Sequence, residues 1–182
     1  MKDSNFIERR REHRLPFNGK IIFTDGARTL TAYSANISRG GVFVTSLEPF
    51  PLDTAGNLAF FLPNHSSSIC VKAKIVHIVF DRQRCEIECG MGLRFVDLNE
   101  QQKSLLNLHI LNEEANYTEL KKLLSEEVPQ AKEVARLTKK LPSLEGLDLL
   151  KLRYKVNRIC TIFEPVPDPF AEAENSSVKQ AS

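Results

Sequence analysis

The stretch that decides the fold reads ICVKAKIVHIV over residues 69–79 and CEIECGMGLRFVD over residues 85–97. In both halves apolar residues alternate with polar or charged ones, which is the period of a β-strand with one buried and one solvated face. The short polar segment at residues 81–84 between them predicts an antiparallel hairpin. His77 shares the parity of the core-facing residues, so we expect it to be buried.

Four further segments upstream read as short strands separated by turns. They cover residues 17–24, 29–37, 42–45 and 58–62. Asp25-Gly26 between the first two is a strong hairpin signal, because glycine tolerates the backbone conformation that tight turns need. Six short strands with turns between them predict a small closed antiparallel barrel.

After Asp97 the apolar period changes from two to three or four, which is typical of amphipathic helices. Asn99 can cap the first helix, Pro129 and Pro142 interrupt the pattern, and Ser143 can cap the last helix. The predicted fold is therefore mainly β: a six-stranded antiparallel β-barrel closed by a helix, with an α-helical C-terminal extension. We expect four parts: an arginine-rich arm (1–14), the barrel domain (15–112), the helical extension (113–163) and a disordered tail (164–182).

Composition narrows the class of protein. The 182 residues are 42% hydrophobic, enough for a core, and the net charge of +2 is too small to indicate a nucleic-acid partner. No stretch approaches the ~20 apolar residues that span a bilayer, so we expect a cytoplasmic protein. The four histidines show no metal-ligand spacing, there is no CxxC pair, and no catalytic motif is present. We therefore expect no metal, no cofactor and no enzymatic activity.

Two local motifs carry chemistry. The first is Arg10-x-x-x-Arg14, directly before the first strand, and the second is Asn36-x-Ser38-x-x-Gly41, at the end of a strand. An arginine fork matches a phosphate or the O6/N7 edge of guanine. Residues two apart on a strand project from one face, so Asn36 and Ser38 could bond the same ligand. Taken singly, the first motif is usually a solvated arm and the second a turn.

Together the two motifs resemble the PilZ domain, a family of bacterial cyclic di-GMP receptors. GMGLRFVD at residues 90–97 resembles the last strand of that family, and the resemblance covers roughly residues 8–112. It implies that Arg10 and Arg14 hold phosphate and guanine. Asn36 would read a guanine edge, and Ser38 would bond phosphate or backbone nearby.

The resemblance also implies that Gly41 keeps its strand clear of the ligand. Arg9, just before the motif, goes in this family with binding a stacked pair of ligand molecules. Ligand would order the arm against the barrel, and a downstream protein partner would read the change through the helical extension.

Two other functions are also compatible with the sequence. The chain could be a PilZ-fold adaptor that works through protein contacts without binding the nucleotide, although such adaptors usually lack the arginine motif. It could also be a barrel that binds single-stranded nucleic acid through a basic arm, which would require exposed aromatic residues on the barrel face.

Overall fold

The computed structural model describes residues 13–63, 68–80 and 89–163. The strands are β1 (Leu15–Pro16), β2 (Lys20–Thr24), β3 (Thr29–Ser38), β4 (Gly41–Thr45), β5 (Ala55–Phe60), β6 (Ile69–Val79) and β7 (Gly90–Asp97). The helices are α1 (Glu100–Leu124), α2 (Ala131–Thr138), the short 3-10 helix η1 (Pro142–Leu144) and α3 (Leu149–Phe163). Among the described residues, no helix is both long and apolar enough to cross a membrane.

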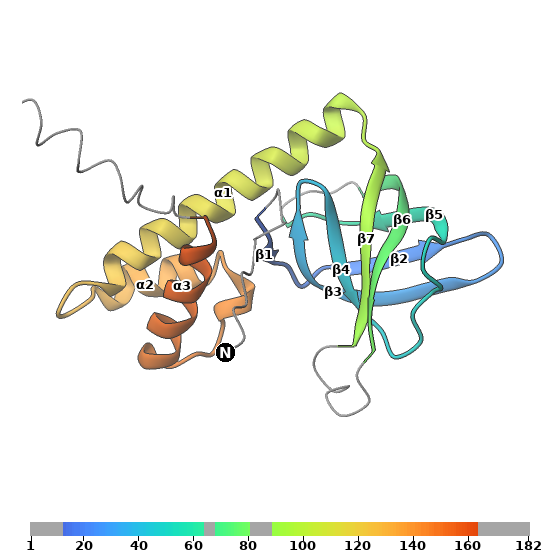
Figure 1. Ribbon diagram of the computed structural model, residues 1–182. Coiled ribbons are helices and arrows are strands. Elements are labelled where there is room, and N and C mark those ends of the chain that lie inside the picture. Colours follow the sequence, from blue (N-terminus) through green and yellow to red (C-terminus); the bar gives the residue numbers. More distant parts are fainter. Residues whose placement is uncertain (1–12, 64–67, 81–88, 164–182) are drawn as a thin grey trace, which may run out of the picture.

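The strands form a closed antiparallel barrel (Figure 1). Its order is β3-β2-β5-β6-β7-β4, and β4 pairs with β3 to close the ring. The predicted six-stranded barrel is confirmed. β1 is an additional short strand that pairs with the end of β3. The interior is filled by buried aromatic and aliphatic side chains, with Phe23 and Phe50 in an edge-to-face contact and Phe60 stacked on Phe95.

The β6–β7 hairpin has the predicted antiparallel pairing, but its register shifts between Ile75 and His77. Ile75 is fully buried, whereas both Val76 and His77 are exposed. An extra residue in one strand breaks the strict alternation of faces. The prediction that His77 is buried is therefore wrong, because the bulge moves it from the core face to solvent.

The predicted turn at Asp25-Gly26 is confirmed. Asp25 Oδ1 accepts hydrogen bonds from the backbone N–H groups of Arg28 at 2.7 Å and Ala27 at 2.9 Å. These bonds stabilise the charged carboxylate and lower the pKa of Asp25. Gly26 has a φ of 96°, which side chains disfavour, and so lets the chain reverse between β2 and β3.

α1 begins where the sequence predicts. Asn99 and Gln102 form a reciprocal capping box, and the Gln102 amide also donates to the Cys70 carbonyl at 2.8 Å. This second bond ties the start of α1 to β6. α1 then crosses the boundary expected between residues 112 and 113 without interruption, so the barrel and the extension share one helix (Figure 1).

α2, η1 and α3 pack beside the second half of α1 (Figure 1). Their shared core contains Tyr117 and Leu120 of α1 together with Val156 and Cys160 of α3, all fully buried. The expected cap of the last helix is wrong. Ser143 lies in η1, and the Asp148 carboxylate instead accepts the Lys151 N–H at 2.9 Å at the start of α3.

Candidate functional site

The pairing of β1 with β3 brings the two sequence motifs together. Leu15 lies opposite Ile37 and Pro16 lies opposite Asn36. Arg14 directly precedes β1, so continuing this antiparallel register places its backbone opposite Ser38. The last arginine of the first motif therefore lies beside the second motif, although 21 residues lie between Arg14 and Asn36 in the chain. Arg9 and Arg10 lie outside the described residues, so their roles stay predictions.

The second motif is held on both edges. Asn36 and Ile37 pair with β1 on one side and with Phe43 and Val42 of β4 on the other. Asn36 is half-buried, and its side-chain amide has no hydrogen-bond partner within the described part of the chain. A side-chain amide that is held by a fixed backbone and has its donors and acceptor available can bind a base edge or a phosphate.

Ser38 and Gly41 close the β3–β4 turn. Ser38 is buried, and its hydroxyl donates to the Gly41 carbonyl at 3.4 Å, a long hydrogen bond. A Cβ on Gly41 would lie 2.2 Å from the Leu93 carbonyl oxygen of β7. The barrel itself therefore requires glycine at this position, whether or not a ligand binds. The close neighbour is β7, and the role of Gly41 toward a ligand stays a prediction.

Arg94 is a further candidate site residue that neither sequence motif contains. This residue lies opposite Gly41 in the β4–β7 pairing and opposite Lys74 in the β6–β7 pairing. Residues directly opposite each other project from the same face of a sheet. Arg94 is exposed, so it adds a cation beside the β3–β4 turn. Only the strand register reveals this neighbour, because Arg94 is far from both motifs in sequence.

The turn also touches the helical extension. Arg39, at a variable position of the second motif, has its guanidinium 3.9 Å from the Glu114 carboxylate of α1. Both side chains are partly buried, so solvent screens this pair less than a surface pair. The contact links the predicted ligand motif to the helix that the barrel and the extension share.

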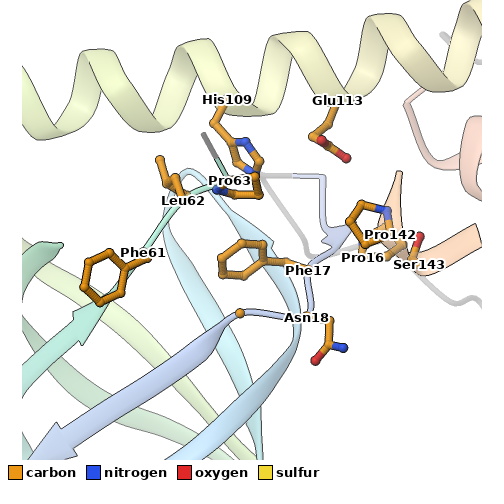
Figure 2. A pocket seen from close by; sticks show the side chains of 11 residues that line it. Pro16, Phe17, Asn18, Phe61, Leu62, Pro63, His109, Glu113, Pro142 and Ser143 are labelled. Carbon is orange, nitrogen blue, oxygen red and sulfur yellow. The ribbon is translucent and has the colours of Figure 1, made fainter. Parts of the chain in front are cut away.

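Next to Glu114 on α1, Glu113 lines a cavity of about 200 Å³ between the barrel and the extension (Figure 2). The cavity walls are mostly apolar, with Phe17 after β1, Phe61 and Pro63 after β5, and Pro142 of η1. The lining further includes Pro16, Asn18, Gly19, Leu62, His109 and Ser143.

Burial in the cavity raises the pKa of Glu113 to about 7, because the apolar surroundings disfavour the charged carboxylate. Other polar groups near the cavity have hydrogen-bond partners. The Ser143 hydroxyl is 2.7 Å from the Tyr117 hydroxyl, and Lys155 donates to the Ser143 carbonyl. Burial also raises the pKa of Tyr117 to about 12. The sequence offers no signal for this cavity, since its walls come from four separate segments.

Comparison with known protein families supports the barrel fold. The PilZ domain family model matches residues 8–112, more than half of the 182-residue chain. A search of curated proteins found no match.

Three solved structures share the fold. The inhibitor of motility MotI/DgrA from Bacillus subtilis is 22% identical with a TM-score of 0.51, and the match covers 60% of this chain and 53% of that one. YcgR from Escherichia coli in complex with c-di-GMP is 18% identical with a TM-score of 0.50, covering 61% and 48%. The MrkH–c-di-GMP complex of K. pneumonia is 14% identical with a TM-score of 0.50, covering 58% and 52%.

The matched region is about half the length of each of these three proteins, and at such identities the likeness shows the fold alone. The family match is the stronger finding, because it extends from the arginine motif to the middle of α1. It includes both motifs and every strand of the barrel, and the chain therefore belongs to the PilZ domain family.

Proposed function

We propose that this chain is a receptor that binds cyclic di-GMP between its N-terminal arginine motif and the β3–β4 turn. The observation that carries the proposal is the β1–β3 pairing, which sets Arg14 beside Asn36 and Ser38. Family membership agrees with it, since PilZ proteins are receptors and effectors rather than enzymes. The solved structures of YcgR and MrkH, which share the fold, are complexes with c-di-GMP.

The chemistry of the site matches a cyclic dinucleotide with two phosphates and two guanines. Arg10 and Arg14 would supply planar forks for phosphate and guanine, and the Asn36 amide would bond a guanine edge. Ser38 would bond phosphate or nearby backbone. Gly41, which the barrel requires, leaves the strand without a side chain next to them. Cyclic di-GMP is the ligand in this proposal, and no further cofactor is needed.

Calorimetry with cyclic di-GMP on the full chain tests this function. We expect a dissociation constant in the micromolar range or tighter, which corresponds to about −8 kcal/mol or better. Arg10→Ala and Arg14→Ala should each weaken binding at least about tenfold, and Arg10→Lys nearly as much, because lysine lacks the planar fork. Lys20→Ala is the matched control, since Lys20 is an exposed cation on β2 that belongs to neither motif.

Absence of heat at about 100 μM ligand, with the barrel folded, would instead favour an adaptor that works through protein contacts alone. The stoichiometry tests the role of Arg9. Two ligand molecules per protomer are expected at saturation, and one molecule would contradict that role while leaving the receptor function intact.

We further propose that ligand orders residues 1–14 on the barrel and that a downstream protein partner reads the change through the extension. The Arg39–Glu114 pair and the shared helix α1 support a physical connection between the turn and the extension. Hydrogen exchange with and without ligand should show protection in residues 1–14 and a change somewhere in residues 113–163. Protection of the arm alone would remove the extension from the mechanism.

A further inference from the structure

α3 carries a groove that the extension leaves uncovered. This α3 groove has a volume of about 490 Å³ and is lined by Leu147, Leu150, Lys151, Tyr154, Lys155 and Arg158. Leu150 is 79% exposed and Tyr154 is 69% exposed. Large apolar side chains gathered in one exposed hollow usually mark a surface that binds another segment of protein.

The rim of the α3 groove is basic. Lys151 pairs with Asp148 at 3.0 Å, and the Lys155 ammonium donates to the Ser143 carbonyl. The Arg158 guanidinium has no hydrogen bond or ion pair within the described residues. The groove would therefore favour a segment that carries acidic groups near these cations and an apolar group between them.

The sequence that follows α3 has that composition. Residues 164–182 lie outside the described residues and read EPVPDPFAEAENSSVKQAS, with four acidic residues and one lysine. Phe170 lies between Asp168 and Glu172. Prolines at alternate positions, 165, 167 and 169, favour an extended chain of restricted freedom, which reduces the entropy lost on binding. Extended proline-rich segments typically bind grooves that contain an exposed aromatic ring.

The reach of the segment after Phe163 also matches the distance back along α3 to the groove. With ~2 residues used to reverse direction after Phe163, Phe170 lies about 15 Å back along α3 at about 3.1 Å per residue. Tyr154 lies about 14 Å back along the helix at about 1.5 Å per residue. The same spacing brings Asp168 to the level of Arg158 and Glu172 close to that of Lys151.

We propose that the α3 groove is the binding site for the acidic segment 164–174 of this same chain, with Phe170 between Leu150 and Tyr154. The tether gives the segment an effective concentration in the millimolar range, so a weak contact suffices for occupancy. Bound in this way, the segment covers the exposed apolar surface of α3 and competes with any acidic partner for the groove. The inference is independent of cyclic di-GMP binding.

Tryptophan fluorescence tests the proposal, because the chain contains no tryptophan. Tyr154→Trp places a probe in the groove of the full chain. Adding Asp168→Asn and Glu172→Gln should raise the acrylamide quenching constant of this probe about twofold, since the segment loses its charge contacts and is released. Ser176→Lys with Ser177→Lys is the matched control, because it changes the net charge equally and should leave quenching unchanged. High salt should raise quenching in the parent and not in the Asp168/Glu172 variant.

Equal quenching in the parent and in the Asp168/Glu172 variant would overturn the proposal. Protection that grows with protein concentration would also overturn it, since the occupant would then be a second copy. A second measurement keeps Tyr154 intact. In the isotope-labelled full chain, Arg158→Glu should shift the amide resonances of Asp168, Phe170 and Glu172, and unchanged resonances would contradict docking even if the tryptophan probe had disturbed the groove.

Discussion

The carboxyl group of Glu113 should make the stability of the protein depend on pH, and Glu113→Gln should remove that dependence. In the folded chain the carboxyl lies in the apolar cavity between the barrel and the extension, where burial raises its pKa. In the unfolded chain it is solvated. A group whose folded pKa is higher binds protons more tightly in the folded state, so the folded state loses stability as pH rises.

The size of this stability change follows from the pKa shift of Glu113. The pKa of Glu113 rises from 4.5 to about 7, and each unit corresponds to about 1.36 kcal/mol. The full shift would amount to about 3 kcal/mol, but Glu113 is only half-buried, and solvent screening reduces this to about 1–2 kcal/mol. The loss begins near the unfolded pKa of 4.5 and is complete above the folded value of about 7.

Urea unfolding of the wild type and of Glu113→Gln at pH 5 and pH 8 measures this effect. Glutamine keeps the shape of the protonated acid and cannot ionise. We subtract the free energy of unfolding of the wild type from that of the variant at each pH. This difference should be about 1–2 kcal/mol larger at pH 8 than at pH 5. Taking the difference between the two proteins at each pH cancels the titration of distant groups common to both.

Glu127→Gln is the control, because Glu127 is an exposed carboxylate in the loop between α1 and α2 and should show no such pH-dependent gain. A stability gain from Glu113→Gln that is the same at both pH values would refute this pH dependence. A variant that is less stable than the wild type at pH 8 would refute it too, since the charged carboxylate would then have a stabilising partner.

Three further substitutions test the site and the fold. Gly41→Ala should lower the free energy of unfolding by about 1–3 kcal/mol through its clash with the Leu93 carbonyl, whereas Gly40→Ala, which meets open space, should change it by less than about 0.5 kcal/mol in the same denaturation assay. Arg94→Ala should weaken cyclic di-GMP binding about threefold to tenfold in calorimetry, as one charge-assisted bond is lost, and unchanged affinity would exclude it from the site. Asn99→Ala should cost about 1 kcal/mol of stability through loss of the α1 cap, and a neutral result in urea unfolding would show that the Gln102 contacts suffice.

The sequence predicted features that depend on residues close together in the chain. Alternation in residues 69–79 identified β6, and Asp25-Gly26 identified the turn between β2 and β3, because each follows from local backbone preference. Asn99 was recognised as a helix cap for the same reason. The two wrong predictions concern His77, displaced by a bulge, and Ser143, which packs against Tyr117 instead of capping α3.

The arginine and Asn-x-Ser motifs could also be identified from sequence alone, since each is a short run of defined residue types. That the two motifs lie side by side could not be predicted, because this depends on β1 pairing with β3. Arg94 beside Gly41, the Arg39–Glu114 contact and the cavity around Glu113 each join segments that are distant in the chain. Periodicity and short motifs report local conformation, whereas strand register and helix packing are set by the combined burial of many distant side chains, and only the tertiary structure decides them.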